Sequence, residues 1–502
     1  MIAPRAMAGA AMGALLVLSR AGAAGAADVG TSTSGANMAV AETRAAQLAA
    51  AGVRGIRPIE VVPFGPGTAE RWRLDNGLHA IVAADGAAGV AAVHVWVKVG
   101  SADETAGKTG LAHLLEHLMF KGTRSRPAGV YDRELEAHGA STNAATWVDW
   151  TMYHQVVPPE VVPLVVQMEA DRFVHLNLTA AGVRSELAVV QNERRETVDS
   201  DPDGLVAEHL GRLVHGGGPY GHPVIGWAAD LAALKRDDVM AFYRQRYVPG
   251  NAAVVVAGTF DPTAVLAEIV HSFGGIAALP PPDRPQCAHG GARLTAEVRQ
   301  AVAIDARAAR LAVAWPTVPR DHADAPALEL LAEALCGAAS ARLDRLLIDD
   351  KRLASDVNCH QDDTRLPGAF DVWVTLRPGR TASEALTALD AAVAALVGPS
   401  PLTAEELDLA RVRATTGLYR QLASADGRAD VLGQTWAVAG SLAAHGQWWQ
   451  RMAQVSPAEV AAAARRWIGA PGRAVVLADP APPVISQRPA GRSGLRVAAR
   501  MP

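Results

Sequence analysis

Cysteine is rare in this chain of 502 residues, and only Cys287, Cys336 and Cys359 occur. None of the three belongs to a C-x-x-C pair, so the sequence indicates neither a disulfide framework nor a cysteine zinc site. Charge of one sign is also lacking, because the net charge is only −4, and no nucleic acid or other polyanion is expected as a partner. The apolar run near the N-terminus is too short for a comfortable membrane span, so none is expected in the mature chain.

Hydrophobic residues are plentiful, at 50% of the chain, which is typical of a globular protein. A chain of this length is too long for one ordinary core, so we expect at least two domains. The Pro-rich stretch 280–290 is the expected linker between a first domain, 61–279, and a second domain, 291–480. Residues 481–502 are rich in Pro, Arg and Gly, and we expect a disordered tail there.

The first residues have the pattern of a secretory signal peptide. Arg5 gives a positive start, residues 6–18 form a short apolar run, and Ala24-Gly25-Ala26 fits a cleavage site between small residues. We therefore expect residues 1–26 to be removed and the mature protein to be periplasmic or secreted, followed by a flexible arm over residues 27–60. An alanine-rich N-terminus without secretion is the alternative.

One short motif carries chemistry: His113-Leu114-Leu115-Glu116-His117, set in an apolar, helix-forming run. Residues four apart lie on one face of a helix, so His113 and His117 can bind a single metal ion. A zinc ion with two imidazole ligands needs a third ligand and an open position for water, and Glu116 is placed to act as a base. The order H-x-x-E-H is the inverzincin signature. The alternative is a pair of surface histidines on an amphipathic helix.

A second predicted helix, over residues 183–199, contains two carboxylates on one face. Glu186 and Glu193 are seven residues apart, which is two helical turns. Carboxylates that face each other inside a fold need a cation or a hydrogen-bond network. The alternative is a solvated acidic stripe paired with neighbouring arginines.

The run Gly110–Thr123 resembles the zinc motif of the pitrilysin/insulinase metallopeptidases, a family that includes mitochondrial processing peptidase and bacterial two-domain zinc proteases. The family's spacing leads from His117 to Glu193, and Glu186 precedes it by seven residues. The resemblance therefore implies one zinc per chain bound by His113, His117 and Glu193, with Glu116 as general base on a zinc-bound water and Glu186 as a supporting carboxylate. Further matches are Gly139–Tyr153, Tyr220–Pro223 with Gly226, and Phe242–Asp261.

The resemblance also implies an α+β fold in which two homologous mixed halves face each other as a clam-like chamber. The sequence contains an internal repeat that agrees with two homologous halves. Residues 242–258 and residues 461–479 both run from a helix through a Pro-Gly turn into an apolar strand. Alternation over residues 93–99 predicts a half-buried strand in the first half. In the second half we expect a strand at 310–315 and a helix at 325–335, which has no histidine and so cannot bind zinc as the first does.

The implied activity is that of a zinc metalloendopeptidase of the EC 3.4.24 type, acting on extended or unfolded peptides. Asn143 and Ala144 are expected on a strand whose edge binds the peptide by main-chain hydrogen bonds.

Active members of the family place an Arg and, seven residues later, a Tyr in the second half, where this chain has Ile348 and Ser355. A homologous zinc-less subunit is therefore expected to supply both in a heterodimer, with a homodimer as the other arrangement. A shifted alignment that uses Arg342, Arg345 or Arg352 is an alternative. A zinc-binding structural or assembly subunit with little or no peptidase activity is the alternative function.

Overall fold

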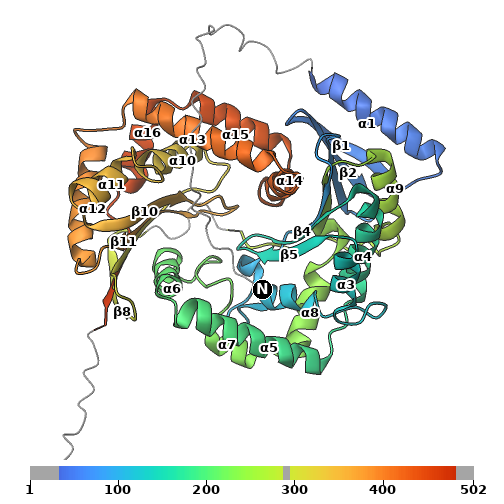
Figure 1. Ribbon diagram of the computed structural model, residues 1–502, viewed down its shortest axis with the longest axis horizontal. Helices are drawn as coiled ribbons and strands as arrows, with labels where there is room; N and C mark the ends of the chain where they lie inside the picture. Colours follow the sequence, from blue (N-terminus) through green and yellow to red (C-terminus); the bar gives the residue numbers. More distant parts are fainter. Residues whose placement is uncertain (1–32, 287–293, 482–502) are drawn as a thin grey trace, which may run out of the picture.

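The computed structural model describes residues 33–286 and 294–481, arranged as two α/β halves that face each other (Figure 1). The predicted signal peptide, Cys287 and residues 482–502 lie outside the described residues. Among the described residues, no helix combines the length and apolar character needed to cross a membrane.

The first half is built on a seven-stranded sheet. Its elements are α1 (Thr33–Ala50), β1 (Ile56–Phe64), β2 (Gly67–Leu74), β3 (His79–Ala84), β4 (Ala91–Val97), α2 (Leu111–Leu118), α3 (Val130–Ala137), β5 (Ser141–Thr146), β6 (Thr151–Val157), α4 (Val162–His175), α5 (Ala180–Arg194), α6 (Pro202–His215), α7 (Ala228–Ala233), α8 (Arg236–Arg246), β7 (Ala252–Gly258) and α9 (Pro262–Phe273).

The second half is built on a five-stranded sheet. Its elements are β8 (Val298–Ile304), β9 (Arg310–Pro316), α10 (Ala325–Leu335), α11 (Arg342–Asp344), β10 (Ala354–Gln361), β11 (Ala369–Leu376), α12 (Ala382–Val397), α13 (Ala404–Leu422), α14 (Ala425–Ala439), α15 (Ala443–Gln454), α16 (Pro457–Ala463) and β12 (Ala474–Pro480). The strand predicted at 310–315 and the helix predicted at 325–335 are confirmed.

The two sheets have the same topology. The first has the order β1-β2-β3-β7-β4-β6-β5, and the second, read from its other edge, has the order β8-β12-β9-β11-β10. In each sheet one pair is parallel, β3 with β7 and β8 with β12, and the matching neighbours are antiparallel. The hairpin β1-β2 is the only addition among the described strands of the first sheet. The predicted fold class and the duplication are confirmed.

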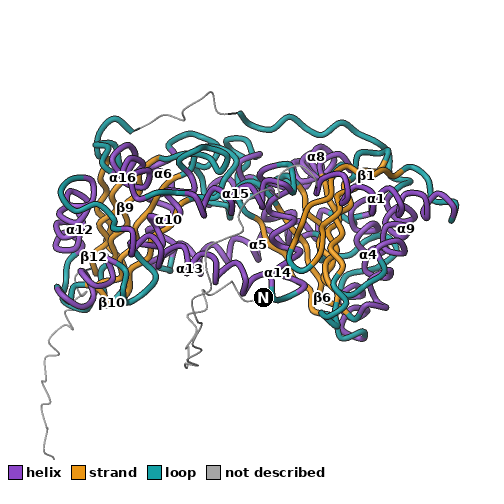
Figure 2. The backbone as a smooth tube through the Cα atoms, turned by 90° about the horizontal axis from the view of Figure 1, so that it is seen from above, coloured by secondary structure: helices purple, strands orange, loops and turns teal. Residues whose placement is uncertain are grey.

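Each half contributes one helix that packs against the sheet of the other half. The helix α14 packs on one face of the first sheet, where Ala429 and Trp436 belong to the same buried cluster as Trp96 and Val255. The helix α6 does the same for the second sheet through Val206, Leu210 and Val214. Figure 2 shows the two sheets at opposite ends of the molecule with α5, α13 and α14 between them. The half-buried strand predicted at residues 93–99 is wrong for this reason, because β4 is covered on both faces and fully buried.

The flexible arm predicted over residues 27–60 is also wrong where the structure describes it, from residue 33 onward. The helix α1 and the strand β1 occupy most of this stretch, and β1 pairs with β2. Ala41 and Leu48 of α1 are almost fully buried, and Arg44 forms an ion pair with Glu70 at 3.1 Å.

Two of the three cysteines form a disulfide, which the sequence did not indicate. Cys336 follows α10 and Cys359 lies in β10, with their Cα atoms 5.4 Å apart. They are 23 residues apart in the sequence, and only the packing of α10 against β10 brings them together.

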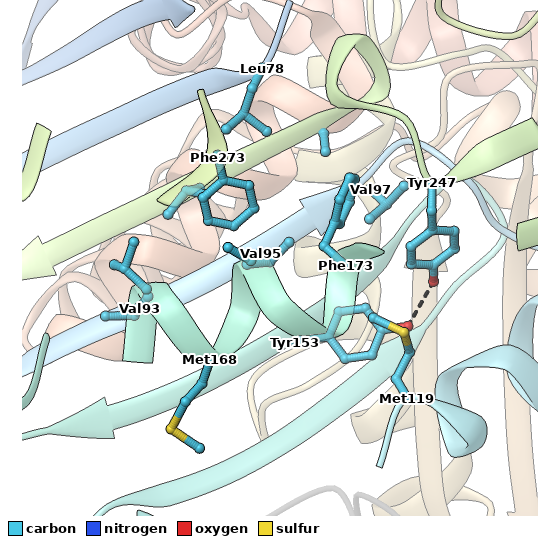
Figure 3. Close-up of a cluster of buried hydrophobic side chains, with 14 of the residues drawn as sticks. Leu78, Val93, Val95, Val97, Met119, Tyr153, Met168, Phe173, Tyr247 and Phe273 are labelled. Carbon is cyan, nitrogen blue, oxygen red and sulfur yellow. Dashed lines mark hydrogen bonds between the residues drawn. The ribbon is translucent and has the colours of Figure 1, made fainter. Parts of the chain in front are cut away.

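The core of the first half lies between its sheet and the helices α2, α4 and α9 (Figure 3). The hydroxyls of Tyr153 and Tyr247 hydrogen-bond at 2.7 Å within it. Met119, at the C-terminal end of α2, lies beside this pair, so the same core that joins sheet and helices anchors the motif-bearing helix.

Candidate metal centre

The helix α2 begins where two glycines meet. Gly110 has a φ of 88°, in the left-handed region, and a Cβ there would lie 2.6 Å from the carbonyl oxygen of Ile225. Gly226 is equally close to Gly110 from the other side. Only glycine fits these positions, because the backbones approach closely and the conformation is strained for other residues. The contact sets the direction in which α2 leaves its loop.

A buried carboxylate caps the same end of α2. Glu104 accepts hydrogen bonds from the backbone nitrogens of Gly110 at 2.8 Å and Ala112 at 2.7 Å, and it lies 3.2 Å from His222 Nε2. Burial raises the pKa of Glu104, although the bonds from His222 and the backbone oppose it. Sequence analysis missed Glu104, since it belongs to no motif, whereas His222 lies in a stretch matched to the family.

Four leucines of α2 face the core, which leaves the polar residues on one stripe. His113, Glu116 and His117 are each partly exposed on that stripe, and α5 packs against it. The hydroxyl of Thr179 caps the start of α5 by accepting from Gly182 N at 3.0 Å. The buried leucines are Leu111, Leu114, Leu115 and Leu118.

The two helices bring together the residues that the motif analysis singled out. His117 Nε2 lies 3.3 Å from Glu193 Oε2, and His113 Nε2 lies 3.8 Å from Glu193 Oε1. One ligand atom from each of the three residues falls within 4.8 Å of the others, close enough to surround a single ion. Glu193 thus lies against the two histidines, whereas the neighbouring Arg194 contacts Asp199 and Glu208.

The electrostatics of this cluster favour a cation. Burial, together with the charge of His117, lowers the pKa of His113 to about 4, so its imidazole is neutral near pH 7. Burial also opposes a charge on His117, but the carboxylates of Glu193, Glu116 and Glu186 outweigh it and raise the pKa of His117. The pKa of Glu193 is lowered despite its burial, because His117 and His113 stabilise the carboxylate.

Glu186 lies just behind the cluster. Its side chain is 4% exposed, with one oxygen 3.6 Å from His117 Nδ1 and the other 2.7 Å from Lys121 Nζ. Sequence analysis missed Lys121, although its position four residues after His117 places it on the same helical side. The carboxylate therefore contacts the ring nitrogen of His117 that does not face Glu193.

Glu116 faces the strand β5. Thr146 donates a hydrogen bond of 2.6 Å to Glu116 Oε2 from the end of that strand. Burial raises the pKa of Glu116, and the charge of Glu193 adds to it. Thr146 is a third residue that sequence analysis missed, because no local pattern links it to a helix residue 30 positions earlier.

The strand β5 is an edge strand of its sheet, as predicted. Asn143 is exposed, and its side chain accepts from the backbone nitrogen of Ala144 at 2.9 Å, while Ala144 packs against the first core. Neither side chain contacts the histidines in the structure. Their place is on the strand that ends at Thr146.

The second half brings no arginine–tyrosine pair to the expected positions. Ile348 lies in the π-helical segment Arg345–Asp350 that follows α11. Ser355 is exposed on β10, where its hydroxyl donates to the carbonyl of Thr375. Arg342 is engaged elsewhere, because its guanidinium binds both oxygens of Glu406.

Comparisons with known proteins agree with this geometry. The family model described as Insulinase (Peptidase family M16) matches residues 80–226, and that described as Peptidase M16 inactive domain matches residues 233–413. An uncharacterized zinc protease of Mycobacterium tuberculosis is 30% identical over 412 residues, which are 81% of this chain and 92% of that protein. The zinc protease PqqE of Helicobacter pylori is 31% identical over 297 residues, or 58% of this chain and 66% of that protein.

Solved structures show the same architecture. The crystal structure of a protease from Helicobacter pylori superposes with a TM-score of 0.78 at 25% identity and covers 82% of this chain and 99% of that one. A putative M16-like peptidase from Alicyclobacillus acidocaldarius shares the fold, with a TM-score of 0.71 at 20% identity over 84% of this chain and all of that one. The chain therefore belongs to the insulinase family of peptidases, Peptidase family M16.

Proposed function

We propose that this protein is a zinc-dependent endopeptidase that hydrolyses peptide bonds in extended or unfolded peptides. The observation that carries the proposal is the convergence of His113, His117 and Glu193 on one point, with Glu116 beside it. The names of the relatives as zinc proteases support the choice of metal.

The donor set fits one zinc ion per chain. Two imidazoles and one carboxylate from two helices are the ligands of a catalytic zinc site, which keeps a position open. Zinc held there would lower the pKa of the attacking water and polarise the scissile carbonyl. Glu186 supports the ligands by contacting His117 Nδ1 at 3.6 Å, which orients that ring.

Glu116 is the proposed general base. Its hydrogen bond from Thr146 fixes one carboxylate oxygen and leaves the other to take a proton from water. Its raised pKa makes the carboxylate a stronger base than an exposed glutamate. The acquired proton can then pass from Glu116 to the leaving amine.

The free edge of β5 is the proposed peptide-binding strand, at Asn143 and Ala144. An extended peptide that pairs with an edge strand gains main-chain hydrogen bonds without regard to its sequence. Thr146 ends this strand and contacts Glu116, so a peptide on β5 would lie alongside the proposed base.

We also propose that a homologous subunit completes the site. The tetrahedral oxyanion needs hydrogen-bond donors, and Ile348 and Ser355 do not provide an arginine and a tyrosine. Tyr419 is the only tyrosine in the second half of the sequence. A similar protein of Schizosaccharomyces pombe is named as subunit beta of a probable mitochondrial-processing peptidase, which agrees with a heterodimer.

A periplasmic or secreted location fits this picture. The first 26 residues have signal-peptide character, and the Cys336–Cys359 disulfide suits an oxidising compartment.

A zinc-binding assembly subunit with little peptidase activity is the second candidate. The match of residues 233–413 to an inactive-domain model favours it. Retention of His113, Glu116, His117 and Glu193 favours the enzyme, because a purely structural subunit has no need of a base.

The test compares three variants for zinc content and for cleavage of a denatured protein. Glu116→Gln should keep its zinc and lose about 10²–10⁴-fold in rate, because only the base is removed. Glu193→Gln should lose most of the zinc bound by His113 and His117. Glu196→Gln is the matched control, since Glu196 is exposed on the turn after Glu193 and should change neither property. Normal cleavage by Glu116→Gln would exclude Glu116 as the base, and full zinc occupancy in Glu193→Gln would exclude that ligand.

A further inference from the structure

A second group of metal-binding side chains lies where the two halves meet. His94 of β4 and His154 of β6 are directly paired across the strands, and Asp426 comes from the first turn of α14. Asp426 Oδ1 lies 2.9 Å from His94 Nε2 and 3.1 Å from His154 Nδ1. All three ligand atoms fall within 4.8 Å of one another.

This group is separate from the peptidase centre, the site formed by His113, His117 and Glu193. His94 shares its face of β4 with Ala92 and Trp96, which α14 covers. The helix α2 packs with Val93 and Val95 on the opposite face of the same strand. The sheet therefore stands between the two groups.

A further carboxyl group lies near these three residues. Asp430, one turn further along α14, is close enough for its charge to act on His94. Two acidic side chains of α14 therefore lie near the two imidazoles.

An aspartate at the matching place in the other half of the molecule is paired with an arginine. Asp203 begins α6 as Asp426 begins α14, and each is followed by a glycine that leaves no space for a Cβ. Asp203 forms an ion pair with Arg310 of the facing sheet. At Asp426 two histidines stand in place of the arginine.

We propose that His94, His154 and Asp426 bind a structural Zn²⁺ ion that joins the first sheet to α14. Two imidazoles and a carboxylate suit zinc, and the bond lengths of about 2.0–2.1 Å in a tetrahedral site separate ligand atoms by about 3.3 Å, near the distances present here. Asp430 or water takes the fourth position. The side chains of His154 and Asp426 are 23% and 42% exposed, which gives the ion a path from the surface.

The proposal is tested in the full chain after the peptidase centre is disabled. The double variant His113→Gln/His117→Gln removes two proposed ligands of that centre. Metal binding by this variant therefore reports on His94, His154 and Asp426 and does not depend on the proposed peptidase activity. This variant should retain about one Co²⁺ per chain after desalting, with the visible absorption bands of a tetrahedral site. Adding zinc should raise its Tm.

Adding His154→Gln, or separately Asp426→Asn, to the double variant should abolish both the bands and the rise in Tm. Adding His175→Gln should not, because His175 and Asp171 form a His–Asp pair of 3.0 Å elsewhere on the surface with no second histidine. Circular dichroism checks that each variant is folded. If the double variant retains no cobalt, or retains it equally with His154→Gln, the cluster is a hydrogen-bonded junction and the zinc site does not exist.

Discussion

The helices α2 and α10 occupy matching places in the two halves but carry different chemistry. In α2, His113-Leu-Leu-Glu-His117 presents two histidines to Glu193 of α5. In α10, Glu329-Leu-Leu-Ala-Glu333 presents two carboxylates, and Glu333 contacts Arg413 of α13. The paired leucines at the centre of both motifs are fully buried.

This difference teaches that the scaffold and the site are separable. The leucines that anchor each helix repeat, because both helices must pack on the same kind of sheet. The partly exposed stripe is free to differ, so one half presents a candidate metal centre where the other presents an ion pair. Function must therefore be argued from the partly exposed polar residues of each helix, not from the fold that the two halves share.

The largest predicted effect concerns the Arg and Tyr that are expected in the second half, where the chain has Ile348 and Ser355. The isolated chain should cleave peptides slowly, and a homologous subunit that carries the Arg and Tyr should raise the rate by about 10²–10³-fold, the effect of one missing oxyanion donor. A peptidase assay of the chain alone at several concentrations, beside one with the candidate subunit, measures this. Robust zinc-dependent turnover by a proven monomer would end the partner hypothesis.

The next prediction separates the two glutamates of α5. Glu186→Gln should weaken zinc binding about 10–100-fold, because an outer partner of His117 is lost while the proposed ligands remain. Glu193→Gln should weaken it more. Competition with a zinc chelator gives both affinities, and equal affinities would contradict the different roles.

Stability should distinguish the interface between the halves from the exposed surface. A Cβ on Gly433 of α14 would lie 2.0 Å from Trp96 Nε1, so Gly433→Ala should destabilise by about 1–3 kcal/mol through overpacking. Gly417→Ala in α13 meets no atom within 4 Å and should stabilise by up to about 1 kcal/mol. Denaturant unfolding measures both, and similar losses in the two variants would show that α14 is not tightly docked.

The last prediction concerns Glu329, at the place of His113. Burial and the charges of Asp363 and Glu333 raise its pKa to about 8, against the opposing effect of Arg320. Because the folded form holds this proton more tightly than the unfolded form, the free energy of unfolding should fall as the pH rises from about 4.5 to about 8.

Glu329→Gln should remove that part of the pH dependence and should be more stable than the wild-type chain near neutral pH, since glutamine resembles the protonated acid without having to bind a proton. Thermal unfolding at several pH values checks this, with Glu42→Gln on the exposed side of α1 as the control. An unchanged pH profile in Glu329→Gln would show that the carboxyl titrates normally.

Local sequence was enough to predict several elements, and together with the family resemblance it predicted the residues of the candidate centre. The periodicity around His113 and the seven-residue spacing of Glu186 and Glu193 are helical properties, so each helix face could be inferred without the fold. The repeat of a helix, a Pro-Gly turn and an apolar strand similarly indicated two related halves.

What the sequence did not reveal depends on contacts between distant segments. Residues 33–60 looked like a mobile arm because their burial depends on β2, and Cys336 reaches Cys359 only through the packing of α10 on β10. The strand at residues 91–97 alternates as if one face met solvent, yet α14, more than 300 residues later, covers that face. Local patterns report the preferences of neighbouring residues, and only the tertiary structure decides which surfaces from remote parts of the chain exclude water from each other.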